Sequence, residues 1–396
     1  MAQCLALLTK GRRMYGCTRL AGFIGVAFLA AACSESVSPS RNASNIGVPQ
    51  FASVGPLAPG GPGITLDQQN GALGYSGTLI RKGFNPTNPH IGDAIVATFY
   101  WVGAPNIIQS VTDVETDAFF TPVGNTYTLV EQVSSGNVNM ATYVATNVQG
   151  FPDPNPGDIV LAVQATFSQP FTDGGIKVSA WSGVNQLAGF TVDAHRSASG
   201  SSSTPTVLGP GAIPLGSGAL AYAVTMSNDV VGSDPPVGFT SIGGSGSDQV
   251  LREDGQYLVS TGVTSVDPHW TWNFNAPSSW VATIVAINPP LHLAFTQQPS
   301  TTLPLMTIQP AVQVAVLDAT GNRAASFTGQ VTIAIGRNGG VVVPGTLSGT
   351  KTVNVVNGVA TFADLSIDQL GNGYTLVVST SGVVTAESAP FNIGAL

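Results

Sequence analysis

The pattern of hydrophobic and polar positions along most of the chain predicts β-strands. From about residue 64, short runs rich in valine, threonine and aromatic residues alternate with glycine, proline, asparagine and aspartate. The clearest runs in the first two thirds of the chain are Ile95–Trp101, Tyr127–Val130, Met140–Val148, Ile159–Phe167 and Ile176–Trp181. No segment combines helical spacing with helix-capping signals. The sequence therefore predicts an all-β protein.

The Pro289–Pro290 pair divides this β-rich region, because a double proline ends a strand and stiffens a junction. We expect residues 64–288 to form a larger, jelly-roll-like antiparallel β-sandwich. Residues 291–396 have the length of one immunoglobulin-like sandwich. Within them Val312, Val314 and Val316 alternate as on a strand with one buried face. The fold prediction is thus a larger β-sandwich followed by a smaller one.

The second segment also carries a recognisable order of short motifs. They are Leu293–Ser300, Pro310–Asp318, Phe327–Ile333, Asn357–Phe362 and Gly373–Leu376. In this order they resemble the bacterial immunoglobulin-like repeats of the invasin and intimin type. The resemblance implies surface display and a spacing or adhesive role, with no catalytic residues to carry over.

The larger segment resembles known proteins more loosely. The motifs Gly92–Asp93, Val111–Asp113, Gly124–Leu129 and Ala141–Ala145 are similar to those of β-sandwich modules in bacterial and phage surface proteins. This resemblance implies a fold and a location and no defined activity.

The N-terminus has the layout of a bacterial export signal. Four basic residues precede an apolar stretch from Leu20 to Leu29, and small residues follow it up to Cys33. The run Leu29–Ser34 resembles a lipobox, which implies that Cys33 carries lipid and anchors the mature protein at the outer membrane or cell surface. The alternative is a soluble-secretion signal in which Cys33 is incidental. If Cys33 carries lipid, residues 1–32 are the signal peptide. Residues 33–63, which are rich in Ser, Pro and Gly, are expected to form a flexible tether.

Charge restricts the choice of partners. Without residues 1–32 the chain has nine basic and 21 acidic residues, a net charge of −12. An acidic chain without a basic patch is a poor partner for nucleic acid or for an anionic membrane surface. We therefore expect no nucleic-acid binding and a membrane contact through the N-terminal lipid only.

Motifs for catalysis are weak. The sequence has no nucleophile elbow, no zinc-protease motif and no phosphate-binding loop. Glu115 and Asp117 lie two residues apart and could form a glycosidase-like pair, although such a pair in a β-sandwich is more often a solvated strand face. The four histidines are scattered singly and are expected to be surface or satisfied side chains, not metal ligands. They are His90, His195, His269 and His292.

Two groups of residues are candidates for ligand binding. Asp113, Glu115 and Asp117 together offer oxygen atoms for calcium, and ordinary acidic turns are the alternative. Trp101 and Trp181 end strands and could stack on a sugar ring, unless they fill the core. For Trp270 and Trp272 the core is the favoured interpretation. No cofactor other than calcium is expected.

These observations lead to one expected function and two alternatives. We expect a non-enzymatic cell-surface lipoprotein with a binding or adhesive β-sandwich, directed at a glycan or an extracellular protein, and an immunoglobulin-like spacer module. The alternatives are a secreted carbohydrate-active enzyme with an accessory immunoglobulin-like module, and a purely structural surface spacer.

Overall fold

A computed structural model describes residues 63–85, 87–149, 159–228, 231–232, 236–242, 251–262, 264–272 and 276–394. This part of the chain contains no helix and is built from mostly antiparallel sheets, so the all-β prediction is confirmed. It accordingly holds no helix that could cross a membrane. The predicted signal peptide, Cys33 and the tether up to residue 62 lie outside the described residues.

The first sheet of the larger body, as we call residues 63–288, has the strand order β1-β6-β2-β5-β4, with β3 added against β6. Its strands are β1 (Thr65–Gly83), β2 (Ala94–Val102), β3 (Ile108–Glu115), β4 (Thr128–Ser135), β5 (Val138–Ala145) and β6 (Leu161–Ser182). Four of the five predicted runs overlap β2, β4, β5 and the start of β6. The fifth, Ile176–Trp181, lies in β6 as well.

The single long strand β6 differs from the two strands that the sequence predicts. Pro170, Gly174 and Gly175 between the two runs suggest a turn, but β6 continues through them, and β1 pairs with it on both sides of Pro170, up to Thr166 and again from Phe171. The register shifts three times between Leu73 and Leu79. Gly74 and Gly77 have φ values of 86° and 103°, which glycine adopts without steric cost. The irregular pair of β1 and β6 bends at these shifts instead of ending.

The second sheet lies against the first and has the order β12-β13-β10-β16-β7. Its strands are β7 (Val192–Ser202), β10 (Leu220–Ser227), β12 (Thr240–Ile242), β13 (Arg252–Val259) and β16 (Ser278–Ile287). Short strands form two further ribbons; these strands are β8 (Thr206–Leu208), β9 (Ile213–Leu215), β11 (Val231–Gly232), β14 (Thr264–Val266) and β15 (Trp270–Trp272).

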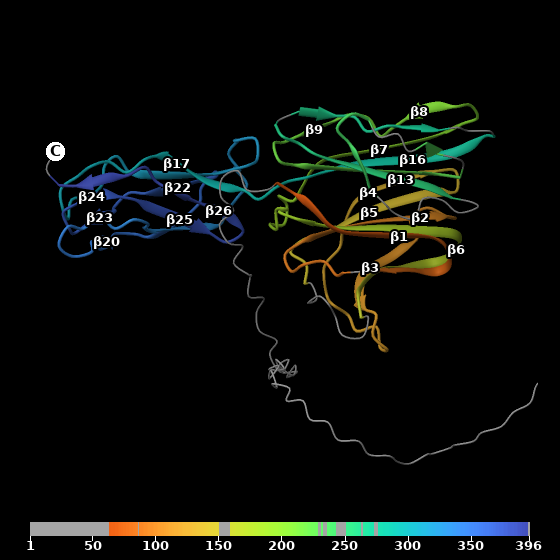
Figure 1. Cartoon of the computed structure of the whole chain (residues 1–396), viewed down its shortest axis with the longest axis horizontal. Coiled ribbons are helices and arrows are strands. Elements are labelled where there is room, and N and C mark those ends of the chain that lie inside the picture. Colours follow the sequence, from red (N-terminus) through yellow and green to blue (C-terminus); the bar gives the residue numbers. More distant parts are fainter. Residues whose placement is uncertain are drawn as a thin grey trace, which may run out of the picture. The chain divides into compact units, whose positions relative to one another are not determined.

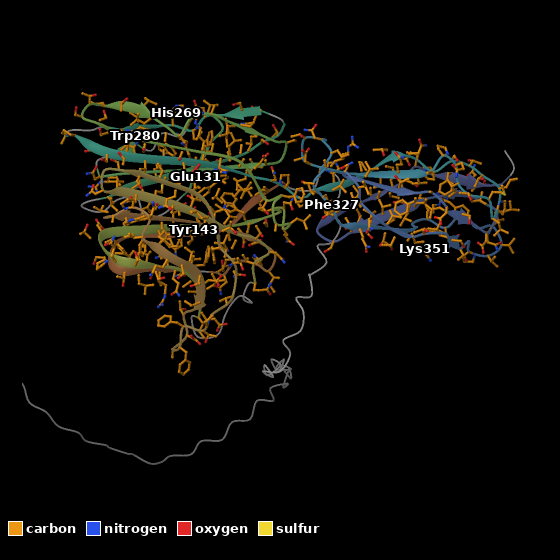
Figure 2. The ribbon with its side chains drawn as sticks, turned by 180° about the vertical axis from the view of Figure 1, so that it is seen from behind. Glu131, Tyr143, His269, Trp280, Phe327 and Lys351 are labelled. Atoms are coloured by element: carbon orange, nitrogen blue, oxygen red, sulfur yellow. The ribbon has the colours of Figure 1, made fainter. Side chains whose placement is uncertain are left out.

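The larger body is a stack of layers in which both central sheets are covered on both faces (Figure 1). One hydrophobic cluster lies between the central sheets and two others lie outside them. In Figure 2, Trp280 belongs to the second sheet and His269 directly precedes β15 of an outer ribbon, whereas Glu131 and Tyr143 belong to the first sheet. All nine residues of β2 and all eight of β10 are therefore buried. This explains why their sequences are mostly apolar rather than alternating, with Thr98 in β2 and with Thr225 and Ser227 in β10 as the exceptions.

The C-terminal module, as we call residues 291–394, has a single hydrophobic core among its described residues. Its main strands are β17 (His292–Gln297), β18 (Val312–Leu317), β19 (Gln330–Ile335), β21 (Thr352–Asn354), β22 (Val359–Phe362), β25 (Leu376–Thr380) and β26 (Val383–Glu387). Two short pairs complete it: β20 (Leu347–Ser348) with β23 (Ser366–Ile367), and β24 (Gly371–Tyr374) with β27 (Phe391–Ile393).

Details of this module agree with the sequence. Val312, Val314 and Val316 are fully buried, as their alternation predicts. Asp318 accepts hydrogen bonds from the backbone N–H groups of Thr320 and Asn322, each at 2.9 Å, and so closes the turn after β18. No strand of the larger body pairs with a strand of the C-terminal module within the described residues. The division at Pro289–Pro290 into independently folding domains stays a prediction.

Candidate functional site

Asp113, the first of the predicted calcium ligands, is a buried anchor for the loop that follows β3. Its side chain is 1% exposed. Oδ1 accepts hydrogen bonds from the backbone N–H groups of Gly124 and Asn125, both at 3.2 Å. Oδ2 accepts from Asn125 Nδ2 at 2.5 Å and from the Tyr127 hydroxyl at 3.1 Å. Burial raises the pKa of Asp113, and these hydrogen bonds partly offset that rise.

Asp117 organises the tip of the same loop. Its Oδ1 accepts hydrogen bonds from the backbone N–H groups of Phe119 at 3.2 Å and Thr121 at 2.9 Å. Its Oδ2 accepts from the Thr121 hydroxyl at 2.7 Å. The hydrogen bonds from Thr121 lower the pKa of Asp117. Asp117 and Glu115 are both half-buried, and within the described residues these two do not join Asp113 in a common group of ligand atoms. Calcium binding stays a prediction, but Asp113 and Asp117 hold their own loop here.

The loop that these aspartates hold, residues 116–127, presents two aromatic side chains; we call it the aromatic loop. Phe119 is 89% exposed. Phe120 lies under the Arg81 guanidinium, which is 3.9 Å from the ring centroid. Phe120 also has a φ of 50°, a conformation that costs a bulky residue energy and persists only when its surroundings enforce it. The loop is therefore built to display Phe119 and Phe120 rather than bury them.

The predicted sugar-stacking tryptophans belong to the core. Trp101 and Trp181 are both 0% exposed, so neither ring has a face that a ligand can reach. Trp101 Nε1 donates to the Ala104 carbonyl and Trp181 Nε1 to the Ser179 hydroxyl, each at 2.8 Å. Both rings therefore fill the core, which was the alternative to sugar stacking. Trp270 and Trp272 are also fully buried, as the sequence favours.

Three of the four histidines have ordinary surroundings. His195 Nδ1 lies 3.1 Å from Oε1 of Glu131, a residue marked in Figure 2. His269 contacts the Asp267 carbonyl at 3.2 Å. Burial lowers the pKa of His292. None of these three belongs to a group of metal-ligating side chains within the described residues.

The fourth histidine, His90, meets two carboxylates. One ligand atom each from Asp67, His90 and Asp93 lies within 4.8 Å of the others. His90 Nδ1 is 2.9 Å from Asp67 Oδ2. The backbone N–H of His90 donates to both carboxylates, to Asp93 Oδ2 at 3.0 Å and to Asp67 Oδ2 at 3.3 Å. Exposure falls from 69% for the His90 side chain to 15% for that of Asp67 and 3% for Asp93.

The electrostatics of this group are unbalanced. Burial, and after it a hydrogen bond with Asp67 and the negative charge of Asp67, together raise the pKa of Asp93 to about 7. The contacts with His90 act in the opposite direction. Near neutral pH the site thus holds fewer negative charges than it has carboxyl groups, because two adjacent carboxylates repel one another.

Sequence reasoning overlooked this group. It treated His90 as an isolated histidine and Gly92–Asp93 only as a motif similar to those of β-sandwich modules. The three-residue spacing of His90 and Asp93 within one turn was an available signal. No signal in the sequence linked Asp67 to this group, because it is 23 residues away from His90 and reaches it through a local irregularity of β1.

A second polar cluster lies between the two central sheets. Lys177 Nζ is 3.1 Å from Glu253 Oε2, and the two side chains are 1% and 0% exposed. Lys177 also donates to the Ile242 carbonyl at 3.4 Å. Burial, followed by the charge of Glu253, raises the pKa of Tyr100 well above its usual value. This cluster is sealed inside the larger body and offers no access to a substrate.

In comparisons with protein-family models, with curated proteins and with solved structures, the chain matches none of them. The candidate sites are therefore interpreted from their own geometry.

Proposed function

We propose that this protein is an exported, lipid-anchored cell-surface protein that binds its ligand without catalysis. In this proposal the larger body is the binding or adhesive unit, and residues 291–396 are an immunoglobulin-like spacer. The observation that carries the proposal is the aromatic loop, in which a buried aspartate holds a strained loop that exposes Phe119.

The construction of the loop favours binding over a purely structural role. A solvent-exposed loop of a spacer gains nothing from a phenylalanine that is 89% exposed, because its apolar surface stays in water. A pre-formed loop loses little conformational freedom when it meets a ligand, so more of the contact energy appears as affinity. Rigid aromatic anchors are also the side chains that most often dominate interface energies.

The same geometry weighs against the enzymatic alternative. A glycosidase needs two carboxyl groups that face each other across the sugar. Asp117 instead directs both oxygens to donors of its own loop, and Trp101 and Trp181 cannot line a sugar site while buried. A glycan or an extracellular protein, bound on the outside of the aromatic loop, is the ligand class we propose.

A binding screen with matched variants tests this proposal. The purified protein is applied to immobilised glycans and extracellular-matrix proteins beside Phe119→Ser and Val207→Ser, which each remove an exposed apolar side chain of the larger body. We expect Phe119→Ser to weaken binding at least tenfold with an unchanged melting temperature, and Val207→Ser to bind normally. Equal binding by both variants, or no binding by the unaltered protein, would contradict the proposal and favour the spacer.

The anchor is tested separately. Cys33→Ser is expected to move the protein from the membrane fraction to the soluble fraction and to remove the mass of the lipid. Unchanged partitioning and mass would show that Cys33 is incidental, and would leave the binding proposal untouched.

A further inference from the structure

The group formed by Asp67, His90 and Asp93 is assembled by backbone features on two segments. Asp67 lies at a register shift of β1, between Leu66, which pairs with Trp181, and Gln68, which pairs with Ala180. Such a bulge leaves one residue out of the ladder and redirects its side chain. The bulge thus accounts for the direction in which Asp67 leaves the strand.

The other two members lie in the turn before β2. The backbone N–H of Asp93 donates to the His90 carbonyl at 3.2 Å, which closes the turn. Val148 fixes the turn to the neighbouring chain: its carbonyl accepts from Gly92 at 2.9 Å, and its N–H donates to the Asp93 carbonyl at 3.0 Å. The backbone of His90 and Asp93, from which the two side chains extend, is therefore held in place by main-chain hydrogen bonds.

The arrangement brings two carboxyl groups together, and within the part of the chain that the structure describes no lysine or arginine forms an ion pair with either of them. Oδ2 of Asp67 and Oδ2 of Asp93 both lie within 3.3 Å of the backbone nitrogen of His90. Two ionised carboxylates this close need a shared proton or a cation between them. The imidazole is the third group, and neutral imidazole is a ligand for transition metals rather than a counter-ion.

We propose that Asp67, His90 and Asp93 form a binding site for Zn²⁺ or a transition-metal ion of similar size. The ligand atoms are one carboxylate oxygen from each aspartate and Nδ1 of His90. This site is independent of the aromatic loop and of the function proposed for it.

The choice of metal follows from the donors and their spacing. Zinc takes nitrogen and oxygen ligands at about 2.0–2.2 Å, which places two ligands of a tetrahedral site about 3.4 Å apart. His90 Nδ1 lies 2.9 Å from Asp67 Oδ2, which is near that spacing. One ligand atom from each of the three residues lies within 4.8 Å of the other two. Calcium prefers six to eight oxygen ligands, a set that two aspartates and an imidazole do not supply. Three protein ligands leave a fourth position for water on the exposed His90 side.

Calorimetric titration with zinc chloride tests the site. The protein is untagged and freed of metal by a chelator, and any cysteine that remains free is alkylated so that it cannot bind zinc. We expect one equivalent of Zn²⁺ to bind and to raise the melting temperature, whereas calcium chloride gives neither effect at the same concentration. Bound Co²⁺ should show the visible absorption of a low-coordinate site.

Variants then assign the ligands. Asp93→Asn and His90→Ala are each expected to weaken zinc binding at least tenfold, whereas His269→Ala, which removes an exposed histidine elsewhere in the larger body, should not. His90 is 69% exposed, so its removal leaves the core intact and keeps the test valid even if Asp93→Asn unfolds. Unchanged affinity in His90→Ala, or no zinc binding by the unaltered protein, would overturn the proposal and leave a shared proton between the carboxyl groups.

Discussion

The larger body and the C-terminal module bury their β-strands in different ways. In the larger body β2 is buried at every position, because the first sheet is covered on both faces. In the C-terminal module β19 alternates, with Val331 and Ile333 in the core and Thr332 and Ala334 exposed. A strand that is covered twice must place whatever polar groups it carries inside the protein.

This difference decides where the charged side chains lie. Within the described residues the larger body buries Lys177, Glu253, Asp93 and Asp113, whereas the buried polar residues of the C-terminal module are Thr375 and Ser388. Burial of a charged group is costly unless hydrogen bonds or an opposite charge compensate it. The larger body therefore depends on specific polar partners, and the C-terminal module on apolar packing.

The comparison is tested most severely by placing a charge on each face of one strand. Val96→Asp and Ala97→Asp point to opposite faces of β2, and both are expected to cost more than about 4 kcal/mol, since each buries an unpaired carboxylate. On β19 only Ile333→Asp should be that damaging, while Ala334→Asp stays within about 0.5 kcal/mol. Chemical denaturation measures all four variants. A mild effect of Ala97→Asp would show that the outer face of β2 is not a core.

The buried ion pair gives the next largest effect. Lys177→Met leaves Glu253 buried without its cation and is expected to cost about 3–5 kcal/mol. The double variant Lys177→Met with Glu253→Leu removes both charges, and should recover most of that loss because apolar side chains can replace a buried pair. If the double variant is as unstable as the single one, the pair contributes packing or hydrogen bonds that apolar groups cannot supply.

The sequence predicted those features of the fold that depend on neighbouring residues. The continuous run Ile95–Trp101 indicated β2, and the alternation of Val312, Val314 and Val316 indicated one buried face. Contacts between distant segments were not predictable in this way. Lys177 meets Glu253 only because two sheets pack together, and Asp67 meets His90 only because β1 bulges. The continuation of β6 past Pro170 depended likewise on its partner strand.

Aspartates show the same contrast through their pKa values. In the C-terminal module Asp364 is exposed, and hydrogen bonds from Thr350 lower its pKa. In the larger body burial raises the pKa of Asp254 to about 6, although its hydrogen bond from Trp270 Nε1 at 2.7 Å acts against the rise. The two carboxyl groups therefore affect stability in separate pH ranges.

The sign of each effect follows from where the proton is bound more tightly. Asp254 holds its proton more tightly in the folded state than in the unfolded chain, whose aspartates titrate near pH 4. Its contribution is thus fully present below about pH 4 and is lost as the pH rises through about 6. Asp364 has the opposite dependence, and its contribution is lost only as the pH falls below about 4.

This last difference gives the smallest predicted effect. Asp254→Asn keeps an oxygen that can accept the hydrogen bond from Trp270. In the unaltered protein the free energy of unfolding should decline between pH 4 and pH 6, and the variant should lack about 1–2 kcal/mol of that decline. This value already allows for the partial exposure of Asp254. Asp364→Asn should leave that interval unchanged and act only at lower pH. Urea denaturation at a series of pH values measures both variants. Equal slopes for Asp254→Asn and the unaltered protein would show that Asp254 is hydrated in the folded state, and would remove it from the interior charges that distinguish the larger body.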